Sequence, residues 1–378
     1  MESAAESDGE LGTLPLDAWH RARGARMVPF AGYAMPIQYD GIVAEHAWTR
    51  EHAGLFDVSH MGQLFLSGDG AEAALEALLP IDLTTLELGG LRYSLLLDDH
   101  GGILDDLIVA RWRQGLFIVV NGATKHADIA WMRERLPAGV ALEHCEDRAL
   151  LALQGPEAFA ALERHTTGHW PLEALAFMRG GPFAVAGVEA WISRTGYTGG
   201  DGFEISFAAA EAERIAEVLS AEPEVRPAGL GARDSLRLEA GLPLYGHDLD
   251  RATDPVGAGL AWAIARRRRA EGGFPGHARI AQLLAAGPGR RRVGLSLDGR
   301  LPAREGAAVF AGEAEVGRVT SGGFSPTLGH PIAMAYVDAA RSATGTELAI
   351  EVRGRRLDAT VVPLPFVPHR YHRQGAAR

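Results

Sequence analysis

Cysteine and lysine are almost missing from this chain of 378 residues. Cys145 is the only cysteine, so an intrachain disulfide and a cysteine-based zinc or iron–sulfur site are excluded. Lys125 is the only lysine, which excludes a Schiff-base lysine at any other position. A single cysteine fits a reducing compartment, and we expect a cytoplasmic protein.

Long apolar runs and an excess of positive charge are also missing. No run approaches the ~20 apolar residues that a membrane-spanning helix requires. The first residues are acidic, unlike a signal peptide or an arginine-rich presequence, so residues 1–12 are expected to form a disordered acidic extension. Lys and Arg number 37 and Asp and Glu number 48, which gives a net charge of -11. This balance argues against nucleic acid or a membrane as a partner.

What the chain does contain is apolar material, at 47% of residues, enough for two or three domain cores. Short predicted strands alternate with short helices, without a regular βαβ repeat, which favours an α+β fold. Asp40 is expected to cap a helix over 42–52, and apolar spacing predicts another helix over 128–136. The segment 265–276 interrupts this pattern. Beyond a boundary near residue 285, closely spaced strands indicate a small β-barrel.

A first candidate motif is Gly-Gly-Ile-Leu-Asp-Asp-Leu at 101–107. Successive strand residues point to opposite faces, so at most one of the two acids faces a pocket. A carboxylate beside apolar walls can act as a base or stabilise a positive charge. The spacing favours a turn-capping role for Asp105, and it leaves Asp106 open between a turn and a pocket.

A second motif, over 193–204, holds four glycines, Tyr197 and, at its end, Glu204. Glycines permit close backbone approach to a ligand. The Glu204 carboxylate can accept two parallel hydrogen bonds from an amidine-like edge such as that of a pterin. A phosphate cradle is disfavoured because no Gly-Lys-Ser/Thr follows, and a solvated Glu in a glycine-rich connection is the plain alternative.

A third motif places Arg233 in the first turn of a helix predicted over 231–240. A cation there is unfavourable for the helix dipole, so Arg233 requires an anionic partner, either an internal acid or a ligand. Ser59 and His60 suggest a hydrolase, but no Gly-x-Ser-x-Gly is present, and a packed histidine is favoured. The basic run 266–269 is either solvated or a dock for an acidic partner.

In their order and spacing, these motifs resemble the aminomethyltransferase (T-protein) family of the glycine cleavage system, from about Thr13 to Tyr371. The resemblance implies an α+β, three-domain clover-leaf, folate-binding fold with antiparallel sheets and a C-terminal β-barrel. Residues 13–62 plus 150–285 would form a discontinuous folate-binding domain 1. Residues 63–149 would form an inserted α+β domain 2, and 286–378 a barrel domain 3. The matching stretches are 30–36, 56–62, 101–107, 193–204, 229–234, 323–328 and 365–368.

The resemblance also implies a reaction with tetrahydrofolate as cosubstrate and no metal. A lipoylated H-protein would present an aminomethyl group, and the products would be 5,10-methylenetetrahydrofolate, ammonia and the dihydrolipoyl carrier. By resemblance, Asp106 is the catalytic residue and stabilises positive charge near the folate N5, while Glu204 binds the pterin. The other implied cofactor-binding residues are Arg233, Tyr93, Asn121, Tyr197, Tyr371, Met61 and Trp262.

Four positions depart from the family pattern, at Pro29, Tyr33, Gly257 and His277. Two other functions stay open on the same fold. One is a tetrahydrofolate-dependent demethylase of a small methylated amine or sulfonium compound. The other is a folate-binding helper of iron–sulfur assembly, which is disfavoured because Cys145 lies outside any cysteine signature of that kind.

Overall fold

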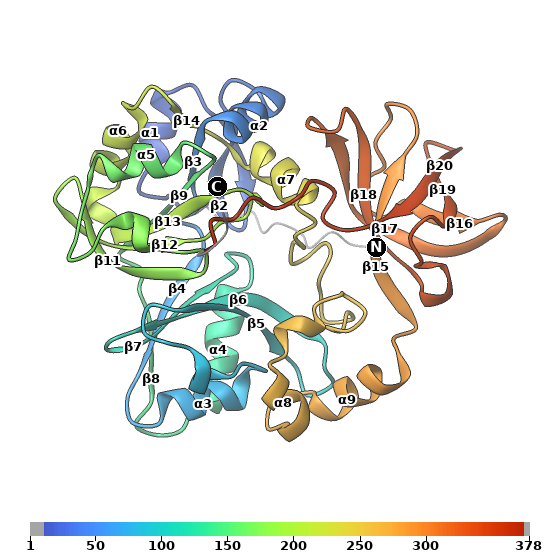
Figure 1. Cartoon of the computed structure of the whole chain (residues 1–378), viewed down its shortest axis with the longest axis horizontal. Helices are drawn as coiled ribbons and strands as arrows, with labels where there is room; N and C mark the ends of the chain where they lie inside the picture. The colour runs from blue at the N-terminus through green and yellow to red at the C-terminus, as the bar shows by residue number, and fades with distance from the viewer. Residues whose placement is uncertain (1–10, 374–378) are drawn as a thin grey trace.

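The computed structural model describes residues 11–373, which form three lobes around a common centre (Figure 1). Two lobes combine a sheet with helices, and the third is a closed barrel, as the expected fold class requires. Most of the predicted N-terminal extension, residues 1–10, lies outside the described residues. Gly12 pairs through its backbone with Gly32 and Ala34. Within residues 11–373, no helix has the length and apolar character needed to cross a membrane.

The first lobe is built on a seven-stranded sheet whose strands come from two separate stretches of the chain. Neighbouring strands are antiparallel, except that β14 runs parallel to β3 at one edge. The order is β10 (Thr166–Thr167), β11 (Arg179–Val185), β12 (Val188–Arg194), β13 (Gly202–Ala208), β9 (Arg148–Gln154), β3 (Ala53–Asp57) and β14 (Val225–Pro227). The lobe also holds a hairpin and five helices: β1 (Arg26–Phe30), β2 (Tyr33–Gln38), α1 (Asp17–Ala22), α2 (Ile42–Glu51), α5 (Ala158–Glu163), α6 (Ala212–Ser220) and α7 (Leu230–Glu239).

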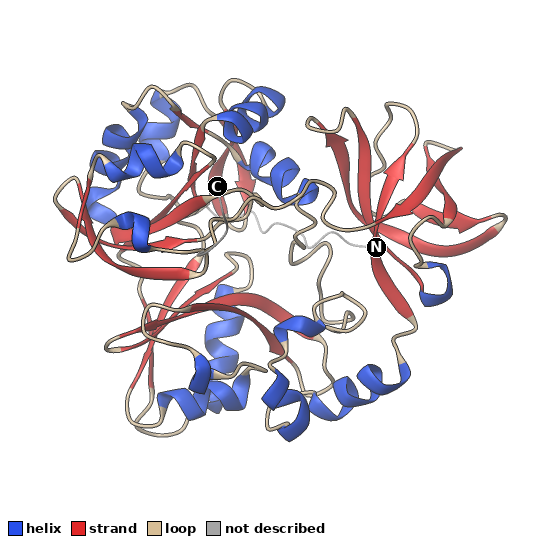
Figure 2. Ribbon diagram, in the orientation of Figure 1, coloured by secondary structure: helices blue, strands red, loops and turns tan. Residues whose placement is uncertain are grey.

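Alternation along β13 determines where the carboxylate of this lobe points. Phe203, Ile205 and Phe207 are buried in the hydrophobic core of the lobe. Because strand residues alternate between faces, Glu204 points to the opposite face of the sheet. The helices α1, α5 and α6 pack on the core side of the sheet, whereas α7 packs on the same side as Glu204, toward the centre of the molecule (Figure 2).

The second lobe has a five-stranded antiparallel sheet covered on its outer side by α3 (Ala71–Leu78) and α4 (Lys125–Arg135). Along β6, Leu107 and Val109 belong to the core of this lobe, so Asp105 shares their face and Asp106 the opposite one. The sheets of the two lobes face each other across the centre (Figure 2). The strand order is β5 (Leu91–Leu97), β6 (Ile103–Trp112), β7 (Gly115–Val120), β4 (Gly62–Ser67) and β8 (Ala141–His144).

The third lobe is the predicted C-terminal barrel, and its presence is confirmed. Valine, leucine and isoleucine side chains from its strands fill the interior. Two helices, α8 (Arg266–Glu271) and α9 (His277–Ala286), lead to it from the second lobe (Figure 1). The strand order around the barrel is β15 (Arg290–Leu297), β18 (His330–Asp338), β17 (Ala314–Ser325), β16 (Ala308–Ala311), β19 (Glu347–Val352) and β20 (Arg355–Val362).

Two local predictions were wrong. The segment 265–276 was expected to be irregular, but it contains α8. Asp40 does not cap α2, because the Glu45 carboxylate accepts hydrogen bonds from the backbone N–H of Tyr39 (2.6 Å) and of Gly41 (3.1 Å). Glu45 also accepts from the N–H of Gly229 (2.8 Å), so one buried acid joins the start of α2 to the start of α7.

Candidate functional site

A cavity of about 1540 Å³ lies where the three lobes meet. This volume exceeds what most small-molecule sites need, and the cavity can hold an extended ligand together with part of a second one. It is lined by the two facing sheets, α7, the barrel strand β17 and the C-terminal segment. All nine residues expected to have functional roles line it: Met61, Tyr93, Asp106, Asn121, Tyr197, Glu204, Arg233, Trp262 and Tyr371.

Asp106 lies on β6 and faces the cavity, whereas Asp105 does not line it. The Asn121 side chain donates from Nδ2 to Oδ1 of Asp106 (2.9 Å) and to Oδ1 of Asp105 (2.8 Å). Burial, together with the charge of Asp105, raises the pKa of Asp106 to about 7. Asp106 can therefore change its protonation state near neutral pH, and its ionised form is held in one orientation by Asn121.

The turn-capping role expected for Asp105 was wrong. The turn before β6 is capped by Asp98, whose Oδ1 accepts from the backbone N–H of His100 (2.8 Å) and of Gly102 (2.9 Å). β6 already begins at Ile103, so Asp105 is a strand residue and is fully buried. It points to the core side of the second lobe.

Glu204 on β13 and Arg233 on α7 both line the cavity. No ion pair within 4.0 Å joins Arg233 to an acid among residues 11–373, although the charges of Arg233 and Glu204 influence each other. Burial raises the pKa of Glu204, and the charge of Arg233 opposes this effect. Arg233 Nη1 is buried and has no hydrogen-bond partner in the described part of the chain.

Both side chains are half-buried, and a charged group that is shielded from water without full hydrogen bonding is destabilising for the protein alone. The geometry therefore favours the ligand alternative for Arg233 over the internal ion pair. The Arg233 guanidinium lies 4.9 Å from the centroid of the Tyr197 ring, and the Tyr197 hydroxyl donates to the carbonyl of Pro243. Tyr197 is thus fixed by the protein, and its ring holds Arg233 beside the cavity.

Aromatic side chains form two other parts of the wall. Tyr93 stacks on Trp262 with ring centroids 5.2 Å apart, and Trp262 is 64% exposed, so this pair lies at an opening of the cavity. Burial and the neighbouring Asp106 carboxylate raise the pKa of the Tyr93 hydroxyl. Tyr371 stacks on Phe177 at 3.9 Å. The C-terminal segment that carries Tyr371 is held on the first lobe by a bond from Arg370 N to Gly199 O (2.7 Å).

The sequence did not assign His60 to the site, yet its ring lines the cavity. Burial and the charge of Arg233 lower the pKa of His60 to about 3, so the ring is neutral at physiological pH. Ser59 is not its partner, because the Ser59 hydroxyl bonds to the backbone of Leu150. Ser59 and His60 therefore do not form a nucleophile–base pair, which removes the hydrolase alternative that rested on these two residues.

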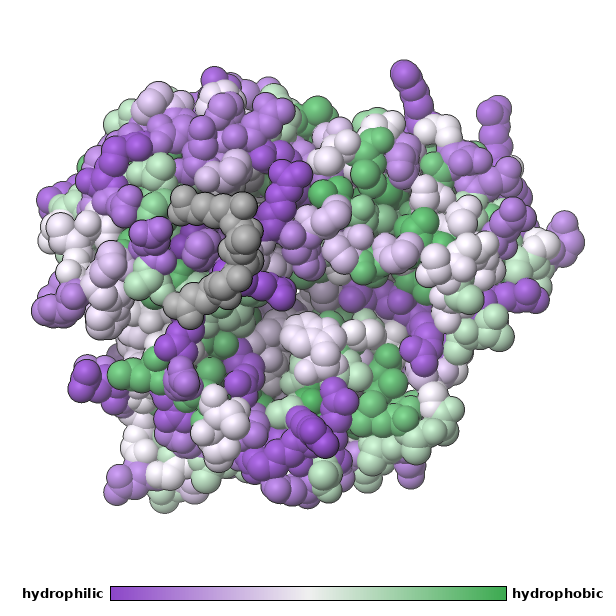
Figure 3. All heavy atoms as spheres, viewed as in Figure 1, coloured by the Kyte–Doolittle hydropathy of each residue, from purple (hydrophilic) through white to green (hydrophobic). Residues whose placement is uncertain are grey.

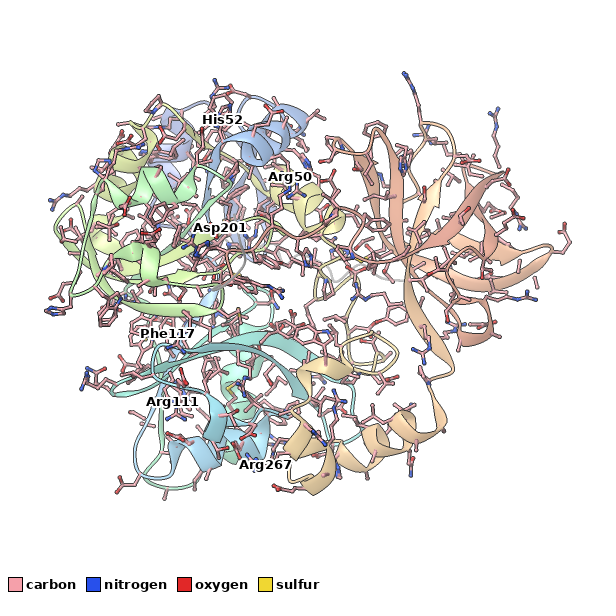
Figure 4. The ribbon with its side chains drawn as sticks, viewed as in Figure 1. Arg50, His52, Arg111, Phe117, Asp201 and Arg267 are labelled. Carbon is pink, nitrogen blue, oxygen red and sulfur yellow. The ribbon has the colours of Figure 1, made fainter. Side chains whose placement is uncertain are left out.

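The arginine run 266–269 is mostly structural. Arg267 pairs with Glu76 (2.6 Å) and Asp82 (3.0 Å), and Arg268 donates to the carbonyl of Glu76. Arg269 likewise donates to backbone carbonyls. Figure 3 shows hydrophilic side chains gathered over α8, and Figure 4 shows Arg267 where α8 meets α3. Only Arg266 of the run is exposed and makes no hydrogen bond or ion pair to the described residues.

Two of the departures from the family pattern make contacts of their own. The Tyr33 hydroxyl accepts from Nζ of Lys125 (2.6 Å), so the single lysine ties the β1–β2 hairpin to α4. His277 Nε2 lies 3.2 Å from the carbonyl oxygen of Arg269 and joins α9 to α8. Pro29 and Gly257 bring no polar side chain and contribute only through the backbone. None of the four changes a polar group that faces the centre of the cavity.

Known proteins match nearly the whole chain. Residues 16–268 match the GCVT N-terminal domain, and residues 290–368 match the glycine cleavage T-protein C-terminal barrel domain. The chain is 44% identical over 377 residues to a probable mitochondrial aminomethyltransferase of Schizosaccharomyces pombe, covering 98% of this chain and 97% of the relative. It is 46% identical over 360 residues to an aminomethyltransferase of Synechococcus elongatus, covering 93% and 95%.

The fold is shared with a crystal structure of glycine cleavage system aminomethyltransferase T from Bartonella henselae. The TM-score is 0.91 and the sequence identity 42%, over 96% of this chain and all of the other. Matches of this extent, together with the two domain matches, show that the chain belongs to the glycine cleavage T-protein family of aminomethyltransferases.

Proposed function

We propose that this chain transfers a methylene group from an aminomethyl-loaded, lipoylated H-protein to tetrahydrofolate. The observation that supports this most is the set of unmet polar groups around one cavity. A carboxylate on β13, a guanidinium on α7 and a second carboxylate on β6 all face it, with few partners from the protein itself. A single cysteine fits work in a reducing compartment, which we take to be the cytoplasm.

In this proposal each side chain has a separate task. Glu204 accepts hydrogen bonds from the ring N–H and amino group of the pterin, for which a carboxylate is the matching acceptor. Arg233 supplies its unpartnered N–H to an acceptor of the folate. Tyr93 and Tyr371 offer flat apolar surface to its rings. Asn121 holds Asp106 in place. The fit is supported by the Arg233 Nη1, which has no hydrogen-bond partner among residues 11–373 and which a polar aromatic ligand would satisfy.

The chemistry requires that the methylene carbon lose its bonds to sulfur and to nitrogen and gain bonds to N5 and N10 of tetrahydrofolate. Two N–H protons of tetrahydrofolate are transferred, one to the sulfur and one to the departing amine. Positive charge develops near N5 while these bonds exchange. The ionised Asp106 carboxylate, held by Asn121 in a site of low dielectric, stabilises that charge more than water would.

The demethylase alternative uses the same fold with a different donor. The full-length relatives at 44% and 46% identity are named aminomethyltransferases, and no feature of the cavity favours a methylated amine. The distinguishing property is the need for a carrier protein, because a demethylase acts on a small donor directly.

The test is to incubate the purified protein with tetrahydrofolate and aminomethyl-loaded H-protein and to measure 5,10-methylenetetrahydrofolate and ammonia together. We expect both products in equal amounts, and neither when H-protein is omitted. Product formed from a small methylated amine without any carrier would replace the proposal by the demethylase. Absence of product with either donor, while folate still binds, would overturn the transfer step.

A further inference from the structure

Gln154, the last residue of β9, lies beneath the cavity wall and has no task in the proposed reaction. Its side chain is completely buried, and it does not line the cavity. In the sheet Gln154 pairs with Gly202 on β13. Ala152, two positions earlier on β9, pairs with Glu204. Because residues two positions apart on a strand share a face, Gln154 lies on the same face as Glu204, the one that packs against α7.

The carboxamide of Gln154 forms hydrogen bonds through both of its ends. Nε2 donates to the backbone carbonyls of Thr195 (3.0 Å) and of Phe203 (3.3 Å). Oε1 accepts from the hydroxyl of Thr198 (3.1 Å). Nitrogen faces carbonyl oxygens and oxygen faces a hydroxyl donor, so these partners fix the orientation of the amide. One buried side chain therefore joins the segment 195–198 to β13.

Two glycines leave the space that this carboxamide fills. A Cβ at Gly196 would overlap the carboxamide of Gln154, and a Cβ at Gly202 would lie 2.6 Å from its Nε2. Both positions are closer than van der Waals contact allows, so a larger residue at either one would displace the amide. Close packing on Gln154 thus accounts for two of the four glycines in the 193–204 motif.

The groups that Gln154 binds belong to two parts of the site. The two threonines flank Tyr197, whose ring holds Arg233 beside the cavity. Phe203 directly precedes Glu204. The loop 195–201 between β12 and β13 contains no helix or strand. Since its glycines restrict the backbone little, its conformation depends on side-chain contacts such as those of Gln154.

We propose that Gln154 is a positioning residue for the cosubstrate site: its carboxamide fixes the loop 195–201 against β13 and so sets the distance between Glu204 and the Tyr197–Arg233 pair. A ligand that binds both groups at once gains affinity when that distance is already fixed, because less freedom is lost on binding. The effect on tetrahydrofolate rests on the proposed function, whereas the effect on the loop does not.

The first variant is Gln154→Met, which keeps the length of the side chain and removes its donors and its acceptor. Gln63→Met is the matched control, because Gln63 is a second buried glutamine, at 2% exposure. Its Nε2 donates to the backbone carbonyl of Arg148 (3.2 Å), and its Oε1 accepts from the hydroxyl of Ser206. None of these three residues lines the cavity. Thermal unfolding of each variant establishes that it is folded.

We expect Gln154→Met to raise the Kd for tetrahydrofolate at least ~10-fold, measured by calorimetric titration. With saturating tetrahydrofolate, kcat should stay within about threefold, because Asp106 and Asn121 belong to the second lobe and make no bond to Gln154. Gln63→Met should leave the Kd within about twofold.

Two further measurements separate positioning from a general loss of stability. In a double-mutant cycle with Glu204→Ala, Gln154→Met should weaken binding by a smaller factor than it does alone, because one of the groups that it positions is already absent. Hydrogen exchange of the backbone amides of 195–201, measured on the free protein, should be faster in Gln154→Met and unchanged in Gln63→Met. If Gln154→Met does not fold, Thr198→Val removes one of the same hydrogen bonds and is measured in the same way.

The outcomes are distinct. Unchanged exchange in the loop, an unchanged Kd, equal losses in the two methionine variants, or strictly additive losses in the cycle would overturn the inference. If the unsubstituted protein binds no tetrahydrofolate, the proposed function fails, and the exchange rates still decide whether Gln154 fixes the loop.

Discussion

Two glutamates of the first lobe, Glu239 on α7 and Glu204 on β13, show opposite uses of a carboxylate in a protein interior. Glu239 is completely buried and accepts from Arg50 (2.8 Å), from the hydroxyl of Ser325 (2.5 Å), and from both the N–H and the hydroxyl of Thr327 (3.0 and 2.7 Å). Figure 4 shows Arg50 where α2 approaches α7. No such bond to the Glu204 side chain is found among residues 11–373.

The pKa values follow the hydrogen bonding. Burial opposes ionisation of both groups. At Glu239 the hydrogen bonds and charge of His46, with those of Ser325 and Thr327, outweigh burial and lower the pKa to about 2. At Glu204 burial prevails and raises the pKa. A carboxylate saturated by donors from α2 and the barrel joins the lobes, whereas a carboxylate left without donors beside a cavity is available to a ligand.

The largest effect is expected from removing Glu239. Glu239→Ala leaves Arg50 and the Ser325 and Thr327 donors buried without an acceptor, and we expect the free energy of unfolding to fall by about 3–5 kcal/mol. Glu204→Ala, the same change beside the cavity, should stay within ~1 kcal/mol, because it removes a carboxylate that has no partner to lose. Urea unfolding of both variants measures the difference, and equal losses would contradict the contrast.

The contrast between Glu239 and Glu204 also predicts how stability depends on pH. The pKa of Glu239 is lowered in the folded state, so its stabilising contribution is fully present above the pKa of an unfolded Glu, about 4.3. That contribution is lost as pH falls from there toward about 2. The stability difference between the unsubstituted protein and Glu239→Ala should therefore shrink over this window. A difference that is constant from pH 7 to pH 2 would show that Glu239 acts by packing alone.

The next largest effect is expected on turnover. Asp106→Asn keeps the shape of the side chain but removes the negative charge, and we expect kcat to fall ~100- to 1000-fold with tetrahydrofolate affinity nearly unchanged. Burial and the charge of Asp105 raise the pKa of Asp106 to about 7. The ionised form is therefore unfavourable for the fold as pH rises through 7, and Asp106→Asn should unfold at a higher temperature at pH 8. Near-normal turnover in Asp106→Asn would show that the negative charge of Asp106 does not contribute to catalysis.

A smaller effect is expected on ligand affinity. Glu204→Ala should weaken tetrahydrofolate binding ~10- to 100-fold, because the lost hydrogen bonds involve a charged acceptor. Calorimetric titration measures the Kd, and Glu239→Gln, which retains an acceptor oxygen outside the cavity, is the control. Unchanged affinity in Glu204→Ala would place the pterin elsewhere in the cavity.

How far the sequence leads can be seen at these same residues. Strand alternation limits β6 to one cavity-facing acid, and Asp106 is that residue. The closed barrel is visible in the spacing of short strands and turns. Strand alternation does not identify the partners of the second acid, Asp105. Asp105 lies near Asp128, which comes from a helix more than twenty positions away, and accepts from Asn121, the residue that follows the next strand. His60 was missed because its surroundings, not its motif, bring it to the cavity.

The smallest expected effect is on the KM for H-protein, and it should differ between two neighbouring arginines of the run 266–269. Arg267 forms ion pairs with Glu76 and Asp82, so Arg267→Ser should lower the melting temperature slightly and leave the KM for H-protein unchanged. Arg266 is exposed, lines an opening of the cavity and has no partner in the described part of the chain. Arg266→Ser should raise the KM for H-protein about two- to fivefold at low salt, an effect that disappears at high salt because a rim charge acts through long-range attraction. Steady-state rates of both variants, measured at low and at high salt, test this difference. An identical response of the two variants would show that the run does not meet the carrier, and that an unpartnered charge at this opening is simply solvated.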